Sequence, residues 1–280
     1  MKERRTAISF RFVRAALSYV ALLVFVLFAL YPITRIITIA LRPSDQLLST
    51  SLAFIPAGAT LNNFRVLLTE TPFLRWLINS TVIALAVTLT GVALGSTAGY
   101  ALSRFRFAGR GSMLNGLLVT QMFPATMLLL PLYLILIKLS LINSYLGVVI
   151  IYTATALPFC IWQLKGYYDT IPLALEESAS IDGCTRWQSF YLVVLPLAAP
   201  ALVITAVFSF ITAWNEYVVV ALILQDVEKF TLPLGLHMFQ ANMSTQWGLY
   251  ASGALLVSIP VVIMFLFLSR YLVSPGVRAQ

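Results

Sequence analysis

The chain alternates between long stretches without charge and short polar segments. A helix needs about 20 apolar residues to cross a hydrocarbon core about 30 Å thick, and six stretches reach that length. Four of them lie between charged residues, at 14–35, 75–104, 110–138 and 138–165, and two lie at about 200–224 and 250–270. The pattern therefore predicts an all-α integral membrane protein with six transmembrane helices.

Glycines recur at every fourth position of the second predicted span, at Gly91, Gly95 and Gly99. Small residues at this spacing let another helix backbone approach closely, so we expect this face to pack against a neighbouring helix. Prolines interrupt the third and fourth predicted spans. Such interruptions occur where neighbouring helices or cavity water satisfy the freed carbonyl groups. The prolines are explained equally well by helices that line a transport pathway and by simple kinks that serve packing.

The distribution of basic residues predicts the orientation in the membrane. An even number of spans puts both termini on one side, and twelve Lys and Arg residues fall on that side against six on the other. Under the positive-inside rule, both termini and the connection at 165–199 face the cytoplasm. Residues 42–75 and 225–249 then form external loops. The first apolar run is as long as a full span and lacks a small-residue cleavage site, so we expect it to stay uncleaved.

The composition excludes a water-soluble domain, since 60% of the residues are hydrophobic and only 10% are charged, against about 25% charged in soluble proteins. The net charge of +8 is spread singly between apolar runs, which gives no continuous surface for nucleic-acid phosphates. We therefore expect a lipid bilayer and no nucleic acid as partner. The two cysteines, Cys160 and Cys184, have no CxxC partner and are predicted to be free thiols.

The most informative polar segment is Pro172–Pro196, which is amphipathic in an otherwise apolar sequence. Asp169 and Thr170 are expected to cap a first short helix, with Pro172 in its first turn. Helix-forming residues continue to Ile181, and Asp182-Gly183 then predicts a tight turn in which glycine takes a positive φ.

A second short helix is predicted to follow this turn. Thr185 and Gln188 have the spacing of a capping box, and Leu195-Pro196 ends the helix. Its apolar side chains recur at helical spacing as one stripe, formed by Trp187, Phe190, Tyr191 and Val194.

The same segment resembles a known family. Glu177-Ser178-Ala179, Gly183 and Val193-x-Leu195-Pro196 match the spacing of the E-A-A-x3-G-x9-I-x-L-P signature of binding-protein-dependent ABC import permeases. Ser178 replaces an alanine and Val193 an isoleucine, both small changes. The resemblance implies that this loop couples the chain to a separate ATPase, through the following residues: Glu176, Glu177, Ser178, Ala179, Asp182, Gly183, Trp187, Leu195 and Pro196.

Further stretches are similar to the sugar-importing, MalG-like branch of this family. They are Asn79-Ser80, Pro124, Pro131-Leu132-Tyr133, Leu157-Pro158-Phe159 and Trp214-Asn215-Glu216-Tyr217. The resemblance implies a type I ABC importer permease fold, with a permease core at 73–272 and its coupling loop at 165–199. Residues 1–72 then hold the N-terminal tail, the first span and an external loop, and 273–280 form a cytoplasmic tail. The implied location is the inner plasma membrane.

The resemblance also implies partners: a second, homologous permease, two ATP-binding subunits and an external solute-binding protein. No nucleotide-binding, protease or esterase motif and no metal-ligand cluster is present in the sequence. We therefore expect a non-catalytic subunit that binds no cofactor, with ATP and Mg in the partner subunits. Import of a polyol, a glycerol phosphate or a polyamine is the nearest alternative to a sugar, and a passive channel or a membrane enzyme is the alternative of another class.

Polar and aromatic residues within the predicted spans are candidates for the pathway or for substrate contact: Asn79, Gln121, Trp214, Asn215, Glu216 and Tyr217. Glu216 is the only carboxylate placed inside a predicted span, where an unpaired charge is costly. It either contributes to a polar constriction in the pathway or is held by backbone amides or by an arginine of the partner permease. In the external loop, aromatic and amide groups of Pro233–Trp247 suit contact with a binding protein or sugar, and equally an interfacial belt.

Overall fold

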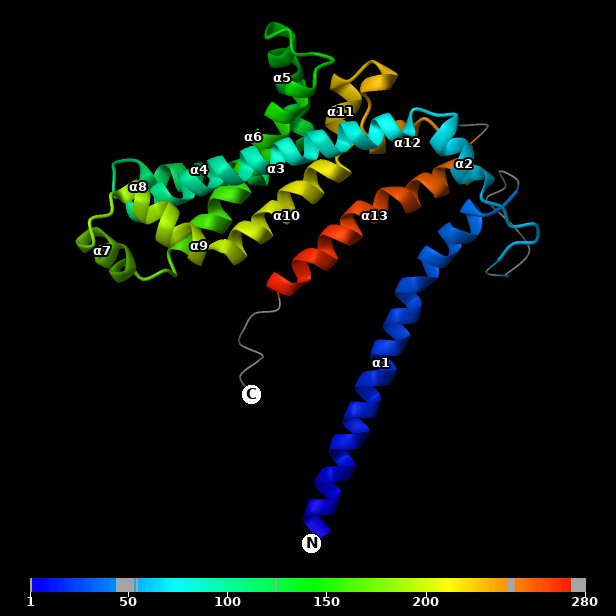
Figure 1. Ribbon diagram of the computed structural model, residues 1–280, viewed down its shortest axis with the longest axis horizontal. Coiled ribbons are helices and arrows are strands. Elements are labelled where there is room, and N and C mark those ends of the chain that lie inside the picture. Colours follow the sequence, from blue (N-terminus) through cyan, green and yellow to red (C-terminus); the bar gives the residue numbers. More distant parts are fainter. Residues whose placement is uncertain (1, 44–52, 54, 124, 241–244, 273–280) are drawn as a thin grey trace. The chain divides into compact units, whose positions relative to one another are not determined.

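The computed structural model describes the chain except residues 1, 44–52, 54, 124, 241–244 and 273–280. The predicted tail at 273–280 and Pro124 therefore lie outside the described residues, as do most basic side chains near the two termini. The elements are helices throughout (Figure 1): α1 Lys2–Ala40, α2 Asn62–Thr69, α3 Phe73–Arg104, α4 Arg110–Met122, α5 Ala125–Lys138, α6 Tyr145–Tyr168, α7 Leu173–Ile181, α8 Arg186–Ser189, the π-helix η1 Phe190–Val194, α9 Leu195–Leu197, α10 Ala199–Asn215, α11 Val218–Ile223, the 3-10 helix η2 Val227–Lys229, α12 Leu232–His237 and α13 Trp247–Leu272.

Four helices of the described chain are long and apolar enough to cross a membrane: the part of α1 from residue 15, α3, α6 and α13. Two further helix pairs meet the same test when each is taken as one bent span. The first pair is α4 with α5, bent by 105°, and the second is the α8–α9 segment with α10, bent by 77°. This agrees with the all-α membrane fold that the sequence predicts, with up to six spans.

Two predicted span limits are wrong in detail. The first span was expected to lie between residues 14 and 35, but α1 continues through Pro32 to Ala40, because a membrane helix tolerates the loss of one backbone hydrogen bond. The fifth was expected to run unbroken from 200 to 224, but its helix stops at Asn215 and restarts as α11 at Val218. A carboxylate at the break, described below, accounts for the interruption.

The described chain forms two compact units, one of residues 1–71 with 239–256 and one of residues 72–238 with the chain from 257 onward. In the first unit, the side chains of α1 are exposed from residue 15 to residue 33. Asn63 in α2 holds the end of this helix, since its amide Nδ2 donates to the carbonyl oxygens of Ala40 and Arg42, each at 2.9 Å.

The core of the second unit is α3 packed against α6 and α10 (Figure 1). The glycine face predicted from the sequence makes this contact. A Cβ on Gly95 would lie 2.6 Å from Cys160 Cβ, and one on Gly99 would lie 3.1 Å from the backbone nitrogen of Lys165. Only a glycine lets the two backbones approach this closely, so the predicted packing face is confirmed.

Polar side chains join the same helices within their apolar interface. Thr90 in α3 and Thr153 in α6 share a hydrogen bond of 2.8 Å, and the hydroxyl groups of Ser96 and Tyr168 share another of 2.8 Å. Cys160, a free thiol as expected, lies 3.3 Å from the hydroxyl of Ser209 in α10. The Ser96–Tyr168 and Cys160–Ser209 pairs are buried, and buried polar groups that satisfy one another fix the register of the helices.

Candidate functional site

The loop at 165–199 has the predicted form of two short helices joined by a turn. α7 ends at Ile181, and Gly183 takes a φ of +89°, the left-handed conformation expected there. Thr185 and Gln188 make both bonds of the capping box. The Thr185 backbone N–H donates to Gln188 Oε1 at 2.8 Å, and the Gln188 N–H donates to Thr185 Oγ1 at 3.3 Å. The turn chemistry of the loop was thus predictable from neighbouring residues.

The predicted cap of the first helix is wrong. Asp169 accepts hydrogen bonds of 2.6 Å from Lys165 and from Ser103, and Thr170 donates to the carbonyl of Tyr167. Both residues therefore close α6 instead of opening α7, which begins at Leu173 without a side-chain cap. Burial raises the pKa of the Asp169 carboxyl, but the bonds from Lys165 and Ser103 outweigh it, so the pKa lies below its usual value.

The predicted apolar stripe of the second helix divides into two parts. Phe190 and Val194 are buried in a cluster with residues of α3, α6 and α10. Trp187 and Tyr191 are 63% and 57% exposed, although their rings stack on each other. The helix makes π-type bonds over Phe190–Val194, a form that is often found at functional sites.

The outer surface of the loop joins exposed apolar groups to exposed acids. Ile181 at the end of α7 is 86% exposed, and Trp187 lies beyond the turn. Glu177, Ser178 and Asp182 are exposed along the same short stretch. Large apolar side chains exposed next to charged groups are typical of a protein interaction surface. Of the remaining candidates in this loop, Gly183 and Pro196 are exposed, while Ala179 and Leu195 are partly buried.

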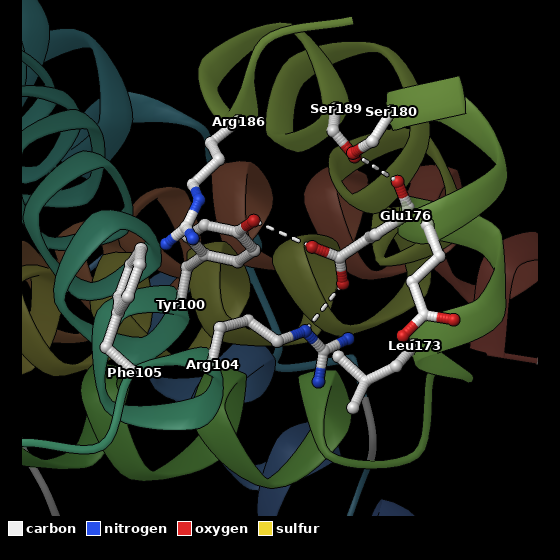
Figure 2. Close-up of a pocket in the computed structure, with 9 residues that line it drawn as sticks. Tyr100, Arg104, Phe105, Leu173, Glu176, Ser180, Arg186 and Ser189 are labelled. Carbon is white, nitrogen blue, oxygen red and sulfur yellow. Dashed lines mark hydrogen bonds and ion pairs between the residues drawn. The ribbon is translucent and has the colours of Figure 1, made fainter. Parts of the chain in front are cut away.

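Glu176 lies apart from this outer surface (Figure 2). Its carboxylate accepts a hydrogen bond of 2.7 Å from the Tyr100 hydroxyl and one of 2.5 Å from Arg104 Nε. The Arg104 and Glu176 side chains are only 9% and 12% exposed, so the ion pair is nearly buried. Arg104 Nη2 also donates to the carbonyl of Ile171 at 3.1 Å. Glu176 thus fastens α7 to the last turn of α3.

A cavity of about 230 Å³ lies beside this ion pair, between the end of α3 and the two short helices (Figure 2). Arg186, the first residue of α8, holds its guanidinium 5.3 Å from the centre of the Phe105 ring. A cation over an aromatic face is attracted by the ring quadrupole. Both short helices of the loop therefore contact the C-terminal end of α3, α7 through Glu176 and α8 through Arg186.

Glu216 lies at the break between α10 and α11. Both oxygens of its carboxylate accept from the backbone N–H of Val219 at 3.1 Å, and Oε2 accepts from the Tyr152 hydroxyl at 2.6 Å. A carboxylate at the first turn of a helix satisfies amides that have no partner within the helix. The contacts are those of a carboxylate held by a backbone amide, one of the two alternatives left open above.

Replacing Glu216 with alanine is expected to lower the thermal stability of the purified protein. The change leaves the buried Tyr152 hydroxyl and the Val219 amide without their acceptor, at about 1–3 kcal/mol for each such group. Glu216→Gln keeps an acceptor oxygen and should have a smaller effect, and Asn215→Ala, at an exposed side chain, should have almost none. Thermal unfolding in detergent checks this order. Unchanged stability of Glu216→Ala with reduced transport would instead assign Glu216 to the pathway.

The remaining pathway candidates are placed differently from one another. Asn79 is buried, and its amide donates to the carbonyls of Glu228 and Phe230 at 2.9 and 3.0 Å. Trp214 is buried and donates to the carbonyl of Val257 at 3.3 Å. Tyr217 is partly buried, with its ring 4.9 Å from that of His237. Asn215 and Gln121 are exposed. Asn79 and Trp214 thus hold the fold together, and the six candidates do not form one cluster.

Sequence reasoning missed the partners of the loop on α3. Arg104 was used only as the charged end of a span, and Tyr100 was not singled out at all. Arg104 and Glu176 are 72 residues apart, and Tyr100 and Glu176 are 76 apart. No local pattern relates positions so distant. The one available signal was a basic residue and an acidic residue predicted on the same side of the membrane.

Comparison with known proteins agrees with this architecture. Residues 91–278 match the family described as "Binding-protein-dependent transport system inner membrane component". The chain is 34% identical over 244 residues to the diacetylchitobiose uptake system permease protein DasC of Streptomyces coelicolor, covering 87% of this chain and 88% of the relative. It is 35% identical over 280 residues to the maltose/maltodextrin transport system permease protein MalG of Salmonella typhimurium, covering 93% of each.

A solved structure shows the same fold. The crystal structure of a bacterial ABC transporter involved in the import of the acidic polysaccharide alginate contains a chain that superposes with a TM-score of 0.80 at 24% identity, covering 92% of this chain and 96% of that one. The fold class expected from the sequence is thus confirmed. The family match and the permease relatives confirm the expectation of a non-catalytic membrane component. By its family match and its relatives, the chain belongs to the binding-protein-dependent transport system inner membrane components.

Proposed function

We propose that this chain is one of two related permease subunits of an ATP-driven importer, and that together they form the pathway for a mono- or oligosaccharide. An external binding protein delivers the sugar. Relatives named for the uptake of diacetylchitobiose and of maltose and maltodextrin support a sugar as the solute. The orientation proposed from the basic residues, with both termini in the cytoplasm, puts the 165–199 loop where ATP is available.

The observation that carries the proposal is the outer surface of this loop. Ile181 and Trp187 expose large apolar surfaces to water, which is unfavourable, next to the exposed carboxylates of Glu177 and Asp182. A cleft in a partner that is apolar at its base and basic at its edge is complementary to this surface. We assign that cleft to the ATPase subunit, which binds the ATP and Mg that this chain does not.

Purification in mild detergent tests the proposal directly. We expect an ATPase, a second permease and a sugar-loaded binding protein to copurify with the chain, and the retained ligand to identify the solute. A retained polyol, glycerol phosphate or polyamine would correct the solute and keep the importer. Solute flux through the purified chain alone, without ATP, would indicate a passive channel and contradict the proposal, as would a chemical reaction catalysed by the chain itself.

Reversing the charge of Glu177 is expected to weaken binding of the ATPase subunit. The Glu177 carboxylate is exposed, forms no ion pair with another residue of the described chain and lies on the proposed docking surface. Removing a charge pair at an interface edge mainly changes affinity and its salt dependence. Glu177→Lys should release the ATPase at moderate salt, whereas Glu70→Lys, at an exposed carboxylate on another loop, should not.

The ATPase retained on immobilised permease at increasing salt measures this effect. A compensating Lys or Arg to Glu change at the edge of the ATPase cleft should restore retention. If Glu177→Lys retains the ATPase as the wild type does at every salt concentration, Glu177 is only solvated.

A further inference from the structure

The loop that we assign to the ATPase is attached to α3 by buried polar side chains. α7 has no buried residue of its own, so the nearly buried Glu176 carboxylate is its principal anchor, held by Tyr100 and Arg104. The second half of the loop is different, because Phe190 and Val194 rest on a cluster shared by several helices. A displacement of α7 is therefore transmitted first to the last turn of α3.

The opposite end of α3 is attached in the same manner to the segment 227–232. Trp76 Nε1 donates to the carbonyl of Val227 at 2.8 Å, and Asn79 binds the carbonyls of Glu228 and Phe230. Ser80 accepts from the backbone N–H of Leu232 at 2.7 Å. Trp76, Asn79 and Ser80 are all buried. This segment belongs to the connection predicted to be external, so the two ends of α3 hold loops on opposite sides of the membrane.

Between these attachments α3 is an unbroken helix. It has 32 residues, about 48 Å at 1.5 Å per residue. Among the described helices of more than 20 residues, it is the one without an internal proline, since α1, α6 and α13 contain Pro32, Pro158 and Pro260. A proline removes a backbone hydrogen bond and favours a kink. α6 also connects the two sides, but Pro158 lies within it, and α10 ends at Asn215.

We propose that α3 is the element through which the 227–232 segment and the cytoplasmic loop influence each other, with Asn79 and Arg104 as the positioning residues at its two ends. The inference rests on the proposed function and adds a route to it. Docking of the loaded binding protein on the external side changes the position of 227–232. The rigid helix carries that change to Glu176, and thus to α7 and the ATPase.

The test uses the complete transporter in lipid vesicles and measures ATP hydrolysis with and without the loaded binding protein. Asn79→Ala and Glu176→Ala should each lower the ratio of stimulated to basal rate about fivefold or more, the effect of losing a typical coupling free energy between sites. Asn115→Ala and Arg106→Gln are matched controls. Asn115→Ala removes the same kind of side chain as Asn79→Ala, and Arg106→Gln removes a positive charge two residues from Arg104. Both positions are exposed, and both variants should leave the ratio unchanged.

The double variant separates transmission from a merely structural role. If both residues act in series through α3, the ratio of stimulated to basal rate in the double variant Asn79→Ala with Glu176→Ala should be no lower than in the more strongly affected single variant. If the two defects are independent, their effects on the ratio multiply. The proposal would be overturned if the reductions of the two single variants multiply in the double variant, or if the ratio is unchanged in both single variants. Where an alanine variant does not assemble, Ser80→Ala and Tyr100→Phe each remove one hydrogen bond at the same ends, and the same criterion applies.

Failure of the proposed function gives a different result. A wild-type chain that binds no ATPase, or an ATPase that does not respond to the binding protein, would contradict the importer itself. If the ATPase responds to the binding protein in the wild type and equally in both single variants, only the role of α3 is contradicted.

Discussion

Gly183→Val is expected to abolish uptake while the chain still inserts into the membrane. Gly183 has a φ of +89°, where a β-branched residue costs about 1–3 kcal/mol. A Cβ added there meets no atom within 4 Å, so the loss comes from the backbone and not from a clash. The turn should relax to a negative φ, which changes the direction of α8 relative to α7 and separates the two parts of the docking surface.

Two controls distinguish a changed backbone conformation at this turn from a general loss of stability. Gly183→Asn should keep most of the uptake, because asparagine adopts the left-handed conformation more readily than other residues. Gly109, with a φ of +88° and equally open surroundings, lies outside the coupling loop. Gly109→Val imposes the same backbone cost and should retain uptake. Uptake and ATPase retention are measured together, and normal uptake by Gly183→Val would contradict the role of this turn.

Gly95→Val is expected to destabilise the whole helical core. The new Cβ would lie 2.6 Å from Cys160 Cβ and 3.3 Å from the Cys160 carbonyl carbon. Because a backbone atom is involved, α6 must move away from α3, and overpacking of this kind costs about 1–3 kcal/mol or more. We expect a lower midpoint of thermal unfolding in detergent and a smaller amount of folded protein in the membrane.

Gly91 provides the matched comparison on the same face. A Cβ there would lie 3.6 Å from Cys160 Sγ and 3.7 Å from Ser209 Oγ, which are ordinary contacts. Gly91→Ala should therefore be tolerated where Gly95→Ala is not, and Cys160→Gly should partly restore Gly95→Ala. Equal midpoints for the two alanine variants would show that close approach at Gly95 does not determine the helix packing.

The sequence by itself determined the features that depend on neighbouring residues. The bilayer requires long apolar runs, so most spans could be located from composition and charge alone. The left-handed turn at Gly183 and the capping box of Thr185 with Gln188 involve residues at most three positions apart. The glycine face of α3 follows from helical periodicity. Such features need no knowledge of the partner helix, which is why the structure agrees with them.

Only the tertiary structure decided what the carboxylates do. Glu176 and Glu177 are adjacent in sequence and were both expected to couple the loop to an ATPase, yet Glu176 turns inward to Arg104, 72 residues away. Glu216 binds Tyr152, 64 residues away, and so ends a helix that hydropathy continues. Asp169 closes α6 because Lys165 and Ser103 lie beside it. A buried carboxylate requires a donor, and which donor is near depends on how the helices pack.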